Sequence, residues 1–397
     1  MKLFYNKNWL FLLTLYLFIF TTINREFLLF GQDLRVIIIM FSLLLIFLKI
    51  KSWGCLLKGI RMIELSFFLL YIFMAISNIG YFYIDFAIDV EVFKNLVILH
   101  LNNLLIIILC FLYKGSLERK KVYLYIKCSV FILLISMLIL YFGGNLSVFI
   151  GENIKVMSVG VFHYNLFGEN FRVAGFAQDP NYATIFLVIG LFCCFADKIK
   201  FNFINIIYIL LCLFGIAISW SKTTILAVVI TSIITGIIYL LKSKYDFKKI
   251  NFKIFWWLIP SGIFFLFLIF PIENLNINSQ TLSTRFYMWG YARKLFEQSM
   301  LFGSGIGSFR VFFNHTGNWL VQAHNTYWQV LSEIGIFGMI SCILIFFNNL
   351  NLGNNKHKIL ILIMLIWAML FEMLYLQVFV LVFYILLLVN VGEEYEK

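Results

Sequence analysis

Long apolar segments recur along the whole chain, and they constrain the fold more than any other feature of the sequence. Of the 397 residues, 62% are hydrophobic and 13% are charged. Soluble domains have roughly 45–50% apolar and about 25% charged residues, so a soluble globular protein is excluded. We expect an integral membrane protein. The chain holds 3 Pro and no low-complexity linker, which predicts a single membrane domain over residues 1–397.

The apolar runs predict the number of membrane spans, since a spanning helix needs about 20 apolar residues. The runs are 9–20, 36–48, 63–83, 93–113, 122–142, 181–196, 201–219, 223–241, 254–270, 326–347 and 358–391. The last run is too long for one span and is predicted to fold back near Glu372. The expected fold is therefore all-α, a polytopic membrane protein with about 12 transmembrane helices.

The distribution of positive charge predicts the orientation of these spans. Connections on the side of the N-terminus carry about twice as many Lys and Arg residues as those on the other side. By the positive-inside rule both termini are expected in the cytoplasm. Most of the Lys and Arg residues behind the net charge of +12 then determine topology and lie near lipid headgroups. We therefore expect no nucleic-acid partner.

Two predicted outer loops are long, 143–180 and 271–323, and the second joins helices 9 and 10. Long outer loops place the chemistry outside the cytoplasm, where nucleotide cofactors are not available. The sequence has no Asp-x-Asp motif or His/Cys cluster on that side, and Asp85, Asp89 and Glu91 are interpreted as a solvated acidic connection. We therefore expect neither a metal nor a cofactor.

Two polar clusters precede predicted spans at their outer ends. In the first, Asp179 and Pro180 suit the N-cap and first position of a helix, whereas capping does not explain Arg172 and Asn181. The second is the turn 219–224, which contains Lys222. Its amine either snorkels to the interface or forms part of an anion site at a helix N-terminus.

A third cluster lies inside the largest outer loop. Ser283 or Thr284 is predicted to cap a helix in which Arg285 and Trp289 share one face. The alternative is an amphipathic helix on the lipid surface. The glycine-rich segment 303–307 lacks a preceding strand and a Walker lysine, which favours a flexible turn over a nucleotide loop.

A fourth cluster opens the tenth predicted span with His324 and Asn325. His324 is either an interfacial polar residue or a general base, since neutral imidazole accepts a proton near pH 7. Glu333, deeper on the same helix, is expected to pair inside the bundle, and Gly335 and Gly338 suit close packing.

The clusters precede the sixth, eighth and tenth spans, all of which are predicted to run inward. Their N-termini, together with Arg172, Lys222 and Arg285, are therefore expected to converge on one anionic group at the outer surface. At that depth the expected anion is the diphosphate of a polyprenyl lipid.

At these residues the sequence resembles the superfamily of O-antigen ligases and repeat-unit polymerases, which are bacterial membrane glycosyltransferases. The resemblance covers roughly residues 172–338 and is most specific at His324-Asn325 and at the Glu-x-Gly-x-x-Gly motif that ends at Gly338. It implies a location in the bacterial cytoplasmic membrane and metal-independent transfer of a glycan from undecaprenyl diphosphate to a sugar hydroxyl. A flippase and a chain-length regulator are the protein partners it implies.

The resemblance also implies roles for individual residues. His324 would activate or position the acceptor, and Arg285 would bind the diphosphate. Where this chain has Lys222, such proteins commonly have Arg, and Lys keeps the charge without the bidentate fork.

The expected reaction is polymerisation of lipid-linked repeat units into a capsule, exopolysaccharide or O-antigen. The nearest alternative is a ligase that passes the same donor to lipid A core or another acceptor. A flippase would instead show charged residues along the middle of several spans and matching halves, and a scaffold would not need His324 and Arg285.

Overall fold

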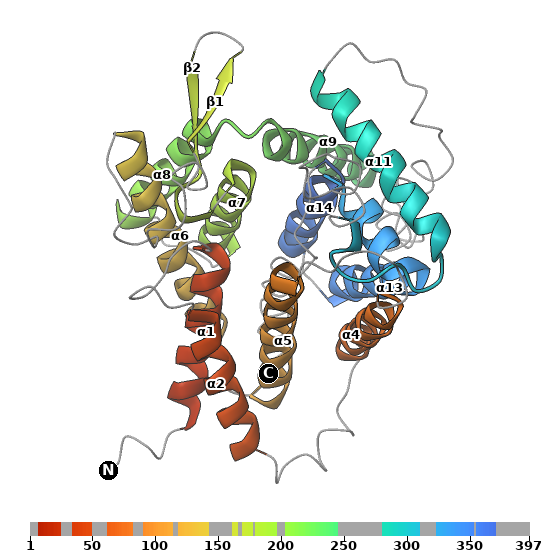
Figure 1. Cartoon of the computed structure of the whole chain (residues 1–397). Helices are drawn as coiled ribbons and strands as arrows, with labels where there is room; N and C mark the ends of the chain where they lie inside the picture. Colours follow the sequence, from red (N-terminus) through yellow and green to blue (C-terminus); the bar gives the residue numbers. More distant parts are fainter. Residues whose placement is uncertain are drawn as a thin grey trace. The chain divides into compact units, whose positions relative to one another are not determined.

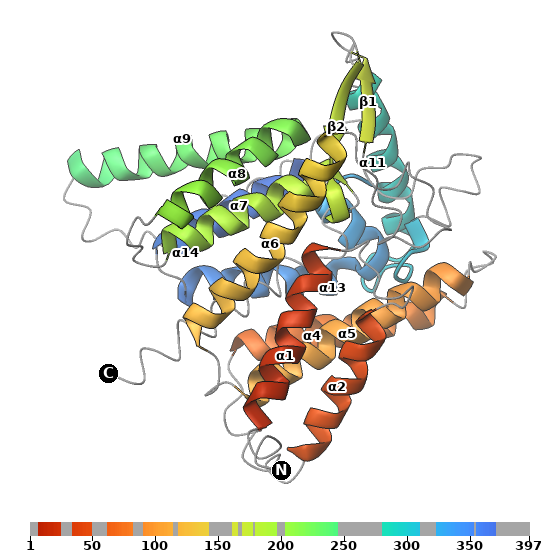
Figure 2. The same ribbon diagram turned by 90° about the vertical axis from the view of Figure 1, so that its left-hand side faces the viewer.

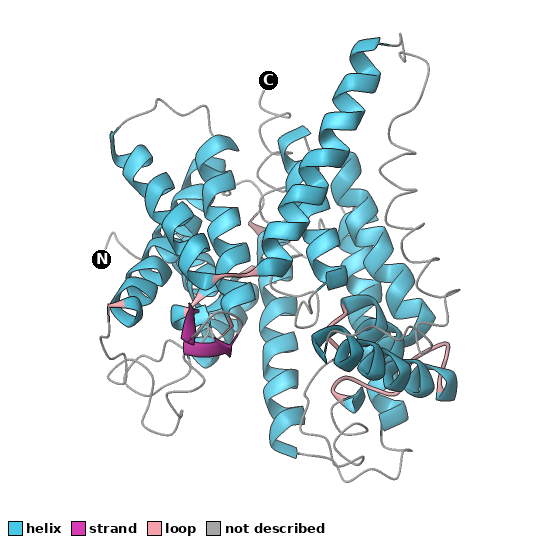
Figure 3. Ribbon diagram, turned by 90° about the horizontal axis from the view of Figure 1, so that it is seen from above, coloured by secondary structure: helices cyan, strands magenta, loops and turns pink. Residues whose placement is uncertain are grey.

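The fold is taken from a computed structural model of the chain. It describes residues 7–24, 34–49, 62–81, 90–113, 118–142, 161–165, 169–177, 179–196, 203–244, 280–309, 323–352 and 355–370. These residues are mainly helical, with one two-stranded hairpin (Figure 3).

The described residues contain eleven α-helices, which confirms the predicted helical fold. They are α1 (Lys7–Ile23), α2 (Leu34–Leu48), α4 (Met62–Tyr81), α5 (Val90–Leu112), α6 (Arg119–Tyr141), α7 (Pro180–Ala196), α8 (Phe203–Ser219), α9 (Lys222–Lys244), α11 (Gln280–Gln298), α13 (Thr326–Leu352) and α14 (Asn355–Leu370). Ten of the predicted apolar runs coincide with these helices over most of their described length. The run 254–270 and the fold-back near Glu372 lie outside the described residues, so the count of 12 spans stays a prediction.

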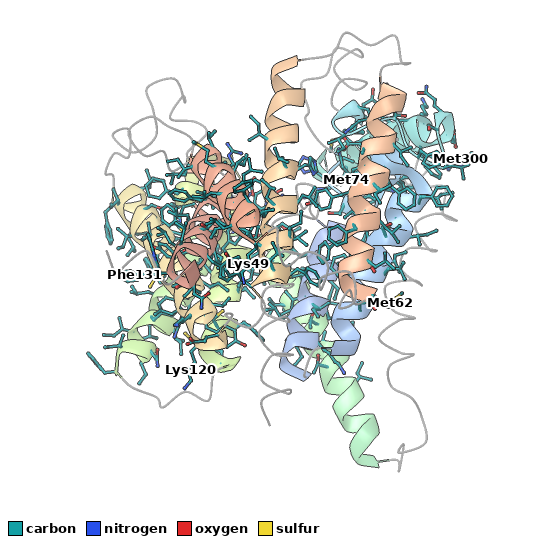
Figure 4. All side chains as sticks on the ribbon, turned by 90° about the horizontal axis from the view of Figure 1, so that it is seen from below. Lys49, Met62, Met74, Lys120, Phe131 and Met300 are labelled. Carbon is teal, nitrogen blue, oxygen red and sulfur yellow. The ribbon has the colours of Figure 1, made fainter. Side chains whose placement is uncertain are left out.

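Two of the described helices contain segments long and apolar enough to cross a membrane, Lys120–Tyr141 and Thr326–Phe346. Eight more described segments are apolar but shorter. Large apolar side chains are exposed on several helices, among them Phe131 on α6 and Met62 on α4 (Figure 4). Exposed apolar faces of this kind suit contact with lipid.

The predicted outer loop 143–180 contains a short hairpin, which the prediction of an all-α fold did not include. Strands β1 (Val161–Asn165) and β2 (Glu169–Val173) pair antiparallel, with Val161 opposite Val173 and Phe162 opposite Arg172. Valine and aromatic residues recur in both strands and favour extended backbone, a pattern that the hydropathy of the whole chain conceals. After β2, the 3-10 helix η7 (Gly175–Ala177) leads to α7.

The chain divides into two compact units, each assembled from separate stretches of sequence. Unit 1 comprises Met1–Gly54, Leu101–Leu226 and Ile385–Lys397, and unit 2 comprises Cys55–His100 and Ala227–Tyr384. The predicted single membrane domain stays a prediction. The units are described separately below.

In unit 1, helix α6 packs against α1, α7, α8 and η7, and Figure 2 shows α6, α7 and α8 side by side. The Asn24 side chain donates to the Ser129 carbonyl at 3.0 Å, which ties the end of α1 to α6. At Gly175, φ is +57°, and a Cβ would collide with Ser136 and Met137 of α6. Only glycine fits there without strain, so η7 and the start of α7 are fixed against α6.

In unit 2, helix α13 packs against α4, α11 and α14, and Figure 1 shows α4 next to α13. The ring of Phe337 on α13 stacks on Phe73 of α4 at 5.3 Å and lies 5.2 Å from Phe302, which follows α11. Apolar contacts between aromatic rings therefore join three segments at one place.

Helix α13 is broken at Gly335, where φ is 73° and ψ is −167°. The turn after α11 fills the break. The backbone N–H groups of Ser304 and Gly305 donate to the carbonyls of Ser332 and Glu333, at 3.0 and 2.9 Å.

After the break, α13 supplies the donors and the segment that follows α11 supplies the acceptors. The N–H groups of Ile336 and Phe337 donate to the carbonyls of Met300 and Leu301, at 2.9 and 3.2 Å. The freed backbone groups of the broken helix are thus satisfied by protein, as buried backbone requires. The glycine-rich segment is a turn, as predicted, but it is buried and hydrogen-bonded rather than flexible.

Replacing Gly335 by alanine is expected to lower the unfolding temperature of the detergent-purified protein by about 5–10 °C. The backbone conformation at Gly335 is essentially restricted to glycine, and a Cβ there would collide with the backbone of Leu301 and Gly303. Thermal unfolding followed by circular dichroism measures the change.

Gly236→Ala is the matched control, because a Cβ at Gly236 on α9 meets no atom within 4 Å. This variant is expected to be as stable as the parent or slightly more stable, since alanine favours a helix. Equal unfolding temperatures for the two variants would contradict the importance of the break.

Candidate active site

In unit 1, Arg172 joins the ends of three elements. It lies in β2, and its Nε donates to the carbonyl of Ser219 at the end of α8 at 3.1 Å. Its Nη2 donates to Oδ1 of Asn181 on α7 at 3.2 Å. The structure therefore brings together Arg172 and Asn181, the two residues that capping left unexplained.

The Asn181 side chain is the centre of this network. Its Oδ1 also accepts hydrogen bonds from the hydroxyls of Ser221 and Thr223, at 2.7 and 2.9 Å. The Ser221 hydroxyl in turn accepts the backbone N–H of Thr224, which caps the start of α9. One amide oxygen thus links the N-terminal ends of α7 and α9 with the guanidinium of Arg172.

Asp179 caps α7, which begins at Pro180, as predicted. One carboxylate oxygen of Asp179 accepts the backbone N–H of Asn181 at 2.7 Å. Burial raises the pKa of the Asp179 carboxyl, and the hydrogen bonds from Asn181 and the charge of Arg172 offset part of that shift. The acidic group in this cluster is thus already used in holding the end of α7.

Lys222 is the first residue of α9, and its side chain is exposed. It follows the tight turn at Trp220, whose φ is 48°. A cation at an exposed helix N-terminus agrees with both predicted roles, snorkelling and anion binding.

In unit 2, α11 carries Arg285 and Trp289 one helical turn apart, as predicted. The helix begins at Gln280, so the prediction that Ser283 or Thr284 caps it is wrong. No Gly or Pro interrupts the residues from Gln280 to Thr284, so the helix extends one turn further back. Arg285 is half-buried, and Trp289 is buried.

The peptide groups around Ala323 are held from two helices. The indole Nε1 of Trp289 donates to the Ala323 carbonyl at 2.8 Å, and the Ala323 N–H donates to Oε1 of Gln329 at 2.9 Å. Both bonds are buried, and each is expected to contribute about 1 kcal/mol. The residue before His324 is thereby fixed to α11 and α13.

His324 itself has a left-handed backbone, with φ at 49°. The next residue, Asn325, is buried and caps α13, because its Oδ1 accepts the N–H groups of Tyr327 and Trp328 at 2.9 and 3.2 Å. Left-handed backbone is costly for a residue other than glycine and persists where its surroundings impose it. Here the hydrogen bonds to Ala323 on one side and the Asn325 cap on the other impose the left-handed backbone.

Burial lowers the pKa of His324 from 6.5 to about 4, and the positive charge of Arg285 adds to the shift. The imidazole is therefore neutral at physiological pH. A neutral imidazole can accept a proton from a hydroxyl group, which is the chemistry predicted for His324.

Glu333 is buried on α13 and pairs inside its unit, as expected. Its Oε1 accepts a hydrogen bond from Nε2 of Gln329 at 2.7 Å, one helical turn closer to His324. Gly335 fits closely, as expected, but against the backbone of Leu301 and Gly303 rather than against another helix.

The predicted site residues thus form two groups. Unit 1 joins Arg172 with Asn181 and has Lys222 at the start of α9, and unit 2 joins Trp289 with the loop of His324. Because Arg172 and Lys222 lie in one unit and Arg285 in the other, their convergence on one anion stays a prediction.

The sequence did not single out three of the residues that organise these groups. Gln329 looked like an ordinary polar residue of a helix, although its spacing of four from Glu333 is a signal for pairing. Ser77 and Asn78 lie on α4, and they contact the glycine turn and the break. The Ser77 hydroxyl donates to the Glu333 carbonyl, and Asn78 accepts the N–H of Ile306.

Comparison with known proteins gives one result that bears on these residues. Residues 207–343 match the family model described as O-antigen ligase, a range that includes Lys222, Arg285, His324 and Glu333 but excludes Arg172. No curated protein matches the chain. The match over residues 207–343 supports a resemblance to the O-antigen ligase and polymerase superfamily, and the apolar helices suit a membrane protein.

Proposed function

We propose that the protein is a glycosyltransferase that polymerises oligosaccharide repeat units linked to undecaprenyl diphosphate. It would act on the outer face of the bacterial cytoplasmic membrane, with both termini in the cytoplasm. The observation that carries the proposal is the His324 loop, which hydrogen bonds from α11 and α13 fix at Ala323 within the range that matches the O-antigen ligase family model. Burial and the charge of Arg285 lower the pKa of His324.

In the proposed reaction His324 accepts the proton of an acceptor sugar hydroxyl. The hydroxyl oxygen forms a bond to the anomeric carbon of the donor sugar, and the bond from that carbon to the diphosphate breaks. The bonding electron pair leaves with the lipid diphosphate, whose developing charge Arg285 stabilises. A lipid diphosphate is already a good leaving group, so these two functions are the main requirements.

Donor binding would also strengthen the base. The charge of Arg285 contributes to the low pKa of His324, and the negative diphosphate would neutralise that charge. The pKa of His324 then rises when the donor is bound, and a stronger base accepts the acceptor proton more readily.

In unit 1 the proposed role is diphosphate binding by Arg172 and Lys222 at the N-terminal ends of α7 and α9. The hydrogen bonds to Asn181 and Ser219 hold the Arg172 guanidinium at those ends. Lys222 would supply a point charge without a bidentate contact. We propose that these cations replace a metal ion in charge stabilisation.

The test is incubation of the purified protein with lipid-linked repeat units, with EDTA and without nucleotide. A ladder of longer lipid-linked glycans is the expected result. A requirement for a divalent cation would contradict the metal-free mechanism, and an absence of any glycan transfer would contradict the function itself.

The ligase reaction is the alternative, because it uses the same donor and differs only in the acceptor. Supplying lipid A core beside the lipid-linked units separates the two. Transfer to the core with no ladder would assign the ligase. Movement of intact donor across a vesicle membrane without glycan transfer would assign a flippase. In the proposed function, a flippase and a chain-length regulator are instead partner proteins.

A further inference from the structure

The Gln329 side chain contacts both the peptide next to His324 and the buried Glu333. Its Oε1 accepts the N–H of Ala323, and its Nε2 donates to Oε1 of Glu333. Gln329 is 3% exposed and Glu333 1% exposed, so water does not substitute for either contact. The two bonds fix which way the Gln329 amide faces.

Glu333 is in turn held through its own backbone. Its carbonyl accepts hydrogen bonds from the N–H of Gly305 and from the hydroxyl of Ser77 on α4. Because α13 breaks two residues later at Gly335, this carbonyl is free of the helix ladder and available to the glycine turn. The backbone from which the Glu333 side chain extends is therefore fixed by α4 and the turn.

A continuous set of contacts then runs from the break in α13 to His324. The glycine turn and Ser77 hold Glu333, the Glu333 carboxylate orients the Gln329 amide, and that amide holds the Ala323 N–H. Trp289 holds the Ala323 carbonyl from the opposite helix. The left-handed backbone of His324 lies at the end of this set.

We propose that Gln329, oriented by Glu333, is a positioning residue for His324, which depends on the proposed function. Gln329 has no contact with the reacting atoms in this role. It fixes the peptide from which His324 extends, so that the imidazole meets the acceptor hydroxyl. A displacement of about 1 Å in such a group lowers a rate by up to about 100-fold.

The amide is needed because it offers one acceptor and one donor. In Gln329→Glu two buried carboxyl groups face each other, and they keep a hydrogen bond only by sharing a proton. The assay is therefore run above neutral pH, where the two carboxylates repel each other and this hydrogen bond is lost. The Ala323 loop is then released or displaced, and kcat is expected to fall about 10- to 100-fold. The KM for the donor is expected to change little, since the cations that bind the diphosphate are untouched.

The decisive variant is the exchange of the two side chains, Gln329→Glu together with Glu333→Gln. The carboxylate at 329 accepts the Ala323 N–H, and the amide at 333 supplies the donor between them, with the same total charge. We expect kcat to recover to within about threefold of the parent. A kcat for the exchanged variant as low as that of Gln329→Glu would overturn the proposal.

Two further measurements separate positioning from stability. The unfolding temperature and the yield of folded protein are recorded for each variant, and kcat is expressed per folded molecule. Ser341→Ala is the control, since it also removes a hydrogen bond of α13, the partly buried bond from the Ser341 hydroxyl to the Phe337 carbonyl, which lies outside this set. A kcat loss in Ser341→Ala equal to that in Gln329→Glu would also overturn the proposal.

The outcomes distinguish this proposal from the proposed function. If the parent protein transfers no glycan, the proposed function is wrong, and the positioning role that depends on it is wrong as well. If the parent is active and Gln329→Glu is equally active, the function stands and the positioning role fails.

Discussion

His324→Ala is expected to lower kcat for glycan transfer by about 100- to 10,000-fold, the range that a general base contributes. The variant keeps the donor-binding cations, so the KM for the lipid-linked donor should stay close to that of the parent. The measurement is the initial rate of ladder formation at saturating donor.

The matched variant is His324→Asn. The backbone of His324 is left-handed, a conformation that asparagine tolerates better than alanine, while asparagine cannot act as a base at neutral pH. We expect His324→Asn to keep the unfolding temperature of the parent and to be as inactive as His324→Ala. Full activity in either variant would exclude His324 as the base.

Arg285→Gln is expected to lower kcat by about 100- to 1,000-fold, since it removes a charge aimed at the leaving diphosphate. A second effect distinguishes this residue from a merely structural one. The charge of Arg285 lowers the pKa of His324, so its removal raises that pKa above about 4. Burial is the larger cause of the shift, so the pKa stays below 6.5.

The pH profile of kcat/KM measures this effect. Protonated imidazole cannot accept a proton, so activity of the parent falls as the pH decreases through about 4. In Arg285→Gln this fall is expected at a higher pH, between about 4 and 6.5. In the control Arg285→Lys the charge is kept and the fall stays near 4. An unchanged profile in Arg285→Gln would show that Arg285 does not act on His324.

The helices were predictable from the sequence because the apolar runs are long and bounded by charges. The predicted start of the tenth span at residue 326 coincides with the start of α13. The hairpin of β1 and β2 was not predictable in the same way, since five-residue strands in a polar loop leave no signal in the hydropathy.

The candidate site was predictable in its residue types but not in its connections. The sequence pointed to Arg172, Asn181, His324 and Glu333 as polar residues near helix ends or inside a span, and to Trp289 as sharing a helix face with Arg285. That Asn181 accepts three side-chain donors, or that Trp289 holds the Ala323 carbonyl, depends on contacts between residues distant in sequence. Gln329 escaped notice because its role depends on a peptide six residues away rather than on its own chemistry.

The break in α13 has a consequence for how the helix exchanges its amide hydrogens. In an uninterrupted helix, the N–H groups of Ile336 and Phe337 are released when the preceding turn of the same helix frays. Here they bond to Met300 and Leu301, while Ser304 and Gly305 bond back to the first half of α13. Deuterium uptake at these four amides therefore reports undocking of the glycine turn as one event, separate from fraying of either half of the helix.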